Sequence, residues 1–202
     1  MKVAELLAED YDDNEISEAD PVMQEALDKV KRDCGPFLEQ CGQQLMYRGT
    51  RRYNTASDPN SFFVRKAART NRSPVNTARW VHEIYDDFFD KKFGIKARSN
   101  TVFTTGNYGT AMEYGMVYAV FPIGDFRFVW SPTIDDLYIH MTDLEDEEDI
   151  RHYLELAKYK DTDLSHAIHS KNEIMVACKE YYMMQVRKSE VKATIKYLFG
   201  ND

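Results

Sequence analysis

Three short segments of this chain place side chains that could bind or react with a ligand at the ends of apolar stretches. The first is Tyr47-Arg48-Gly49-Thr50, the second is Val102-Phe103-Thr104-Thr105-Gly106, and the third is a strand-like run that begins at Glu173. An arginine is always charged and can grip a phosphate group with two donors. A carboxylate can stabilise positive charge that develops on a sugar ring. The segments lie far apart in the sequence, so they predict one site only if the fold brings them together.

These groups suit the cleavage of NAD at its nicotinamide bond, because positive charge develops on the ribose as the pyridine leaves. Glu173 could stabilise that charge and accept a hydrogen bond from a ribose hydroxyl. Arg48 could hold the diphosphate, and Gly49 would let the main chain come close to it. Tyr108 or Phe121 could stack on the nicotinamide, although core packing is the expected role of Phe121.

Other candidate groups have plainer explanations. The three cysteines, Cys34, Cys41 and Cys178, have no paired metal spacing, so we expect reduced, packed thiols and no metal site. His82 falls on a strongly predicted helix and is expected to be a surface or hydrogen-bonded side chain. Asp136 would be the catalytic carboxylate if the first choice proved to be misplaced.

Composition predicts one globular domain. Of the 202 residues, 43% are hydrophobic and 13% are aromatic, which allows a substantial core. No apolar run reaches the ~18 residues that a membrane-spanning helix requires, and the acidic N-terminus is unlike a secretion signal. We therefore expect a cytoplasmic protein without membrane contact, and the sequence leaves its oligomeric state open.

The net charge of −8 is unevenly distributed along the chain. Residues 1–20 contain eight acids and one lysine, whereas residues 48–79 contain eight basic residues and one acid, Asp58. A basic segment in an acidic protein favours a local anion site, and the alternative is a solvated surface.

The residue pattern predicts a mixed α+β domain. The first 19 residues are interpreted as a frayed tail or a short helix, and the basic residues 65–72 lead into a loop at Ser73-Pro74. Helices are expected over residues 20–35, 77–94 and 110–114, and after a capping box formed by Thr142 and Glu145. Strands are expected over residues 43–48, 101–105, 116–121, 126–130, 173–177 and 180–186, with residues 122–125 as a hairpin connection.

The three segments, taken in order, resemble those of ADP-ribosyltransferases of the arginine-serine-glutamate class. Tyr47-Arg48-Gly49 is similar to the family's Tyr-Arg-Gly strand, and residues 102–106 are similar to its aromatic-x-Ser-Thr-Ser strand. Residues 172–176 resemble the strand that begins at the family's catalytic glutamate. A helix and a strand are expected between the second and third segments, as in the family. The likeness runs from about Tyr47 to Tyr182.

The resemblance implies one domain over residues 1–202, with an acidic segment and helix over 1–42 and an NAD-binding core over 43–202. The implied fold has split β-sheets flanked by helices, as in toxin-like and phage-like members. The implied activity is mono-ADP-ribosyl transfer from NAD, as a substrate and without metal, to a protein or nucleic acid. The implied catalytic residues are Glu173, Thr104, whose hydroxyl would hold the carboxylate, and Arg48. The implied NAD contacts are Arg48, Gly49, Thr50, Thr104, Thr105 and Tyr108.

The chain departs from the family pattern at two positions. Gly106 replaces the last serine of the second segment, which leaves Thr104 as the main support for the carboxylate. Lys171 stands where arginine-modifying members carry a second glutamate, so the acceptor is expected not to be an arginine side chain. The alternative is a non-enzymatic nucleic-acid or protein-binding module on a degenerate transferase fold. To hold nucleic acid, it would use the basic stretch Arg51 to Arg79 with Tyr53, Phe62 and Phe63, and neutralising Arg65, Lys66, Arg69 and Arg72 would test it.

Overall fold

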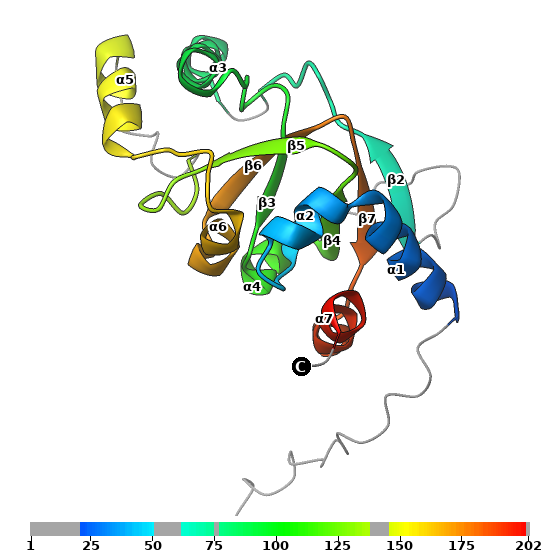
Figure 1. Ribbon diagram of the computed structural model, residues 1–202. Helices are drawn as coiled ribbons and strands as arrows, with labels where there is room; N and C mark the ends of the chain where they lie inside the picture. The colour runs from blue at the N-terminus through cyan, green and yellow to red at the C-terminus, as the bar shows by residue number, and fades with distance from the viewer. Residues whose placement is uncertain (1–20, 51–61, 75–76, 138–145, 201–202) are drawn as a thin grey trace, which may run out of the picture.

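The computed structural model describes residues 21–50, 62–74, 77–137 and 146–200. The seven strands of this described part form one antiparallel sheet with helices on both faces (Figure 1). The expected α+β class is therefore confirmed. In their order across the sheet, the strands are β2 (Phe63–Ala67), β7 (Glu180–Gln185), β4 (Met116–Pro122), β1 (Met46–Thr50), β3 (Val102–Thr105), β6 (Glu173–Cys178) and β5 (Phe126–Trp130).

The sheet is almost divided between β1 and β3. These two strands share one residue pair, Tyr47 with Thr105, whereas every other neighbouring pair of strands shares four or five. The group β2-β7-β4-β1 thus meets the group β3-β6-β5 at one point. The resemblance predicted two separate sheets, whereas the seven strands of the described part form one continuous sheet with a single residue pair at its centre.

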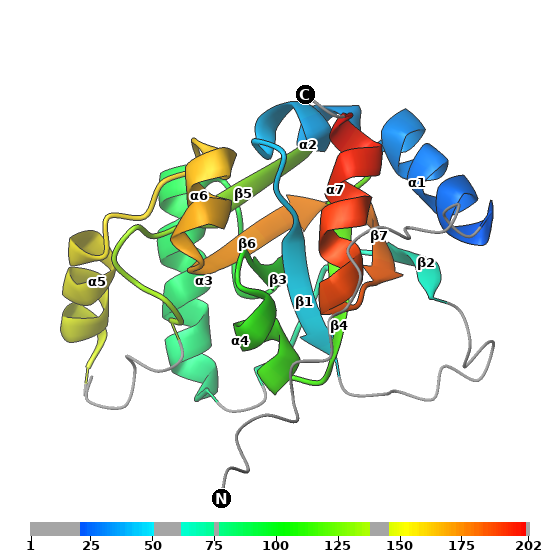
Figure 2. The ribbon, with the colours of Figure 1, turned by 90° about the horizontal axis from the view of Figure 1, so that it is seen from below.

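The helices divide between the two faces of the sheet. In Figure 1, α3 and α5 lie above the sheet and the other helices lie below it; Figure 2 shows α6 and α7 in front of the strands. Two apolar clusters match this division, since one unites residues of α1, α2, α6 and α7 and the other unites residues of α3 and α5. The helices are α1 (Pro21–Asp33), α2 (Gly35–Gln40), α3 (Arg79–Phe93), α4 (Tyr108–Glu113), α5 (Glu147–Leu156), α6 (Leu164–Ser170) and α7 (Val191–Phe199), which follows the 3-10 turn η2 (Lys188–Glu190).

Helix α3 supports one wall of the site described below. Val81, Ile84 and Phe88 recur at helical spacing and are buried against the sheet and α5. The helix ends at Gly94, whose left-handed φ of 64° and N–H bond to the Asp90 carbonyl form the predicted C-cap. The sequence pattern predicted this element correctly because its buried stripe is long and its cap is a glycine.

The predicted hairpin over residues 122–125 is wrong. β4 pairs with β1 and β7, whereas β5 pairs with β6 and, at Trp130, forms an isolated bridge with Lys160. The connection over residues 123–125 therefore crosses from one group of strands to the other. Its Gly124 N–H donates to the carbonyl of Asp33 at the end of α1 (2.8 Å), which anchors the turn to a helix instead of a hairpin partner. β6 and β7 likewise belong to different groups.

Several element boundaries differ from the predictions. β2 runs into the basic stretch, where no strand was predicted. α6, capped by the Asp163 side chain, lies before Glu173, where no helix was predicted. Helix α4 begins at Tyr108, two residues before the predicted start, because the side chain of Asn107 accepts hydrogen bonds from the first turn. The predicted N-terminal tail, the cap at Asp20 and the capping box of Thr142 and Glu145 lie outside the described residues.

None of the helices in the described ranges is both long and apolar enough to cross a membrane.

Candidate functional site

A cleft of about 340 Å³ opens where β1 and β3 diverge. Both residues of the single pair between these strands line the cleft, and helix α4 and the turn before β3 contribute to its walls. All three of the segments singled out in the sequence reach this cleft. The lining side chains that could bind a ligand or take part in a reaction include Arg48, Arg72, Arg98, Phe103, Tyr114, Asp136 and Glu173.

Glu173 is the first residue of β6 and lies opposite Thr105 of β3. Its N–H donates to the carbonyl of Asp135 (2.9 Å), which ties the start of the strand to the segment after β5. The side chain is 17% exposed, and its buried Oε2 atom has no hydrogen-bond partner among the described residues. Leaving a buried carboxylate oxygen unsatisfied costs free energy. This atom is therefore positioned to accept a hydrogen bond from a ligand.

The protonation of Glu173 is set by opposing effects. Burial raises the pKa of its carboxyl group, Arg98 lowers it, and the nearby Asp136 raises it further. The Nη1 atom of Arg98 lies 3.6 Å from Oε2 of Glu173, and the Arg98 side chain is only 12% exposed. Arg98 is thus the main cation that favours the ionised form of this carboxylate.

Arg48 lies on β1 at the point where the sheet divides. Its Nη1 donates to the carbonyl oxygen of Phe103 on β3 (3.1 Å), just beyond the single pair that joins the two strands. Burial lowers the pKa of Arg48, but a guanidinium remains charged at neutral pH. Because a guanidinium has five N–H donors, this contact with the protein leaves others for a ligand.

The two threonines of β3 direct their hydroxyl protons to main-chain carbonyls and not to the carboxylate of Glu173. The Thr104 hydroxyl donates to the carbonyl of Ile174 (3.1 Å), and the Thr105 hydroxyl donates to the carbonyl of Lys171 (2.7 Å). A hydroxyl has one proton to donate, so neither threonine has one left for the carboxylate. The expected role of Thr104 in holding the carboxylate is corrected accordingly. Both hydroxyls instead fix the main chain on either side of Glu173.

Gly49 and Gly106 are required by packing of the main chain. A Cβ atom at Gly49 would lie 1.8 Å from the carbonyl oxygen of Ala111 in α4, and one at Gly106 would lie 1.8 Å from the carbonyl oxygen of Ile168 in α6. Both helices therefore cross these strands at distances that only glycine permits. The close approach of α6 therefore explains why Gly106 stands where the ADP-ribosyltransferase pattern has its last serine.

Two of the predicted NAD contacts lie outside the cleft. Thr50, at the end of β1, is not among the described residues that line it. Tyr108 packs edge-on against Tyr47 and donates its hydroxyl to the Val186 carbonyl (3.1 Å), so it is part of the core. Phe121 is fully buried, as expected for a packing residue.

The aromatic residues that do line the cleft are Tyr114 and Phe103. Tyr114 is more than half exposed, and its hydroxyl donates to Oδ2 of Asp136 (3.2 Å). Asp136, the alternative carboxylate, therefore lies in the same cleft as Glu173 and contributes negative charge beside it.

The sequence did not assign Arg72 or Arg98 to the NAD site. Arg72 stands among other basic residues and has no local pattern that sets it apart, and Arg98 comes from a turn between a helix and a strand. The excess of basic residues over 48–79 did indicate an anion site, and Arg48 and Arg72 of that segment reach the cleft. Their shared location could be seen only once the fold was known.

His82 also lines the cleft but is occupied by protein contacts. It is buried, with Nε2 at 2.9 Å from the Ser99 hydroxyl and 3.5 Å from Asp86 Oδ2. Burial lowers the pKa of His82, so the ring is neutral at pH 7. Within the described ranges, no group of three or more histidine, cysteine or acidic side chains is arranged to hold a metal ion.

Compared with models of protein families, with curated proteins and with solved structures, the chain gives no match.

Proposed function

We propose that this protein is an NAD-dependent mono-ADP-ribosyltransferase. One observation carries the proposal: Arg48 and Glu173, selected from segments 125 positions apart in the numbering, line one cleft, and a buried carboxylate oxygen of Glu173 has no hydrogen-bond partner in the described part of the chain. A site that cleaves NAD needs cations for the diphosphate and an anion for the ribose. Both kinds of group face the same space here.

In the proposed reaction, the bond between ribose C1′ and the nicotinamide nitrogen breaks, and its electron pair neutralises the pyridinium. A nucleophile of the acceptor forms the new bond to C1′ and loses its proton to the solvent or to a base. Glu173 would stabilise positive charge on the ribose, and Arg98 would keep Glu173 ionised. Arg48 would bind the diphosphate.

The proposed acceptor is a macromolecule, either a protein side chain other than arginine or a nucleic acid. Lys171 supports the exclusion of arginine, because it is exposed at the C-terminal end of α6 and supplies no second carboxylate there. Without an acceptor, water would take its place and free ADP-ribose would form. We further propose that the reaction occurs in the cytosol, where the three free cysteines would stay reduced.

The experiment mixes the purified protein with a cell extract and NAD that is labelled in its adenylate phosphate. We expect labelled macromolecules, and mass spectrometry should find an ADP-ribose adduct on a defined residue or base. Glu173→Gln should lose the labelling, whereas the matched control Glu180→Gln should keep it. Glu180 is also the first residue of a strand, but it pairs with Arg65 and does not line the cleft.

Equal labelling by wild type and Glu173→Gln would refute the assignment. The alternative of a non-enzymatic nucleic-acid module has less support, since Arg65 is paired with Glu180 and Arg72 faces the cleft. Salt-dependent nucleic-acid binding without any consumption of NAD would favour that alternative.

A further inference from the structure

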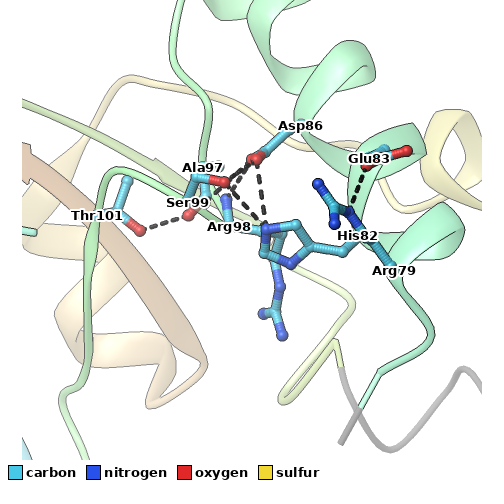
Figure 3. Close-up of polar contacts among 8 residues, drawn as sticks. All are labelled: Arg79, His82, Glu83, Asp86, Ala97, Arg98, Ser99 and Thr101. Carbon is cyan, nitrogen blue, oxygen red and sulfur yellow. Dashed lines mark hydrogen bonds and ion pairs between the residues drawn. The ribbon is translucent and has the colours of Figure 1, made fainter. Parts of the chain in front are cut away.

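A partly buried turn before β3 is organised by one buried carboxylate of α3, Asp86. Its Oδ1 accepts hydrogen bonds from the N–H groups of Arg98 (2.8 Å) and Ser99 (3.2 Å), and its Oδ2 accepts from the Ser99 hydroxyl (Figure 3). Because that hydroxyl donates its single proton to Asp86, His82 must donate from Nε2 to the Ser99 oxygen. The Thr101 hydroxyl closes the turn by donating to the carbonyl of Ala97.

This turn holds two arginines of the cleft. Arg98 belongs to the turn itself, and the N–H of Arg72 donates to the carbonyl of Ser99 (3.1 Å). Both guanidinium groups lie over the ring of Phe103, with their carbon atoms 4.4 Å (Arg72) and 4.7 Å (Arg98) from the ring centroid. The main-chain bonds to one turn therefore bring two positive charges to one aromatic ring.

Two guanidinium groups beside one ring repel each other unless negative charge compensates them. Arg98 has Glu173 at 3.6 Å, but Arg72 has no acidic partner within 4 Å among the described residues. Burial and the neighbouring arginines lower the pKa of Arg72 to about 10, so it stays charged at neutral pH. The cleft thus contains a half-buried cation that none of the described acidic side chains approaches within 4 Å.

We propose that Arg72 and Arg98 join Arg48 of the same cleft in a preformed site for the paired phosphates of a diphosphate, and that Asp86 is the positioning residue of Arg72 and Arg98. Phosphate oxygens suit two guanidinium groups held at a fixed separation, because each can donate more than one hydrogen bond. This inference rests on the proposed function only in taking the diphosphate to be that of NAD. Asp86 acts through the turn and touches no ligand itself.

The test measures binding of inorganic pyrophosphate by titration calorimetry, without NAD or acceptor. Arg72→Gln should weaken the affinity about tenfold or more, and Asp86→Asn should weaken it about threefold to tenfold. The control Asp87→Asn should change it less than about twofold, since Asp87 is on the same helix but pairs with Lys91 and Arg151 at the surface. Circular dichroism establishes that each variant is folded.

The double variant separates positioning from a general structural effect. If Asp86 acts by holding Arg72, Asp86→Asn should lower the pyrophosphate affinity by a smaller factor in the Arg72→Gln background than in the wild type. If the two residues act independently, the fold-losses of the single variants should multiply in the double variant. Wild-type affinity in Arg72→Gln would overturn the site, and multiplicative losses would overturn the positioning of Arg72 by Asp86. If Asp86→Asn does not fold, Ser99→Ala, alone and combined with Arg72→Gln, applies the same criterion to the turn.

The results also distinguish this inference from the proposed function. Arg72-dependent binding of pyrophosphate without any ADP-ribosyl transfer would leave the anion site standing and remove the enzyme assignment. Transfer that depends on Glu173, with pyrophosphate binding unaffected by Arg72→Gln, would remove the anion site alone.

Discussion

Replacing Arg98 with methionine is expected to raise the pKa of Glu173 and thereby shift the pH dependence of NAD turnover. Methionine keeps an unbranched stem beside Phe103 but removes the positive charge that lies 3.6 Å from the carboxylate. Burial and Asp136 would then raise the carboxyl pKa without the opposing effect of Arg98. If the reaction requires ionised Glu173, activity should appear only at higher pH.

The size of the shift follows from the geometry of the pair. Opposite charges at this separation interact by about 4–5 kcal/mol at an effective dielectric constant near 20. At about 1.36 kcal/mol per pKa unit, this corresponds to roughly 3 units. The side chains of Arg98 and Glu173 are still 12% and 17% exposed, so solvent reduces the effect. We therefore expect an upward shift of about 1–3 units.

The assay follows nicotinamide release and determines kcat/KM between about pH 5 and pH 9. The acid limb of the Arg98→Met profile should lie above that of the wild type by the predicted amount. Arg79→Met is the control, because Arg79 is exposed and pairs with Glu83 on the surface of α3. A uniform loss of activity with an unshifted acid limb would refute the ion-pair argument and leave Arg98 as a binding group only.

Three further predictions concern packing, protonation and substrate contacts. Gly106→Ser should lower the free energy of unfolding by about 1–3 kcal/mol in urea titrations, because its Cβ would strike the Ile168 carbonyl. In the control Gly35→Ser, where a Cβ meets open space, the free energy of unfolding should fall by less. Folding raises the pKa of Glu173 above its unfolded value of 4.5. The carboxyl group therefore contributes its stabilisation, relative to glutamine, below pH 4.5 and loses it as the pH rises through the folded-state pKa. The unfolding free energy of wild type minus that of Glu173→Gln should fall with pH. Tyr108→Phe should leave the KM for NAD unchanged and lower stability by about 0.5–1.5 kcal/mol, because its hydroxyl bonds to the core; a raised KM with unchanged stability would return Tyr108 to the site.

The sequence predicted those parts of the fold whose signals are local. Helix α3 has a long buried stripe and a glycine cap, and β3 and β6 are short apolar runs bounded by polar residues. Strand pairing could not be predicted from the same signals, because it depends on contacts between distant segments. Residues 122–125 have hairpin composition, yet the turn is fixed by Asp33 of α1, which lies 91 positions before Gly124.

The same distinction applies to the candidate site. Arg48 and Glu173 were recognised by residue type and order, whereas Arg98 reaches the cleft only through the bonds of its turn to Asp86. The Thr104 hydroxyl was predicted to bond to the Glu173 carboxylate, because sequence alone does not show which acceptor lies nearest to a hydroxyl group. The structure places the Ile174 carbonyl there, 3.1 Å from the Thr104 oxygen.

The most direct test of the central claim is the rate of nicotinamide release from NAD by the purified protein, compared with that of Glu173→Gln. Removing a group that stabilises charge in the transition state typically lowers the rate about 10²–10³-fold. We expect a loss of that size in Glu173→Gln and an unchanged rate in the surface control Glu180→Gln. Release at the wild-type rate by Glu173→Gln, or none by the folded wild type with NAD and cell extract, would contradict the account.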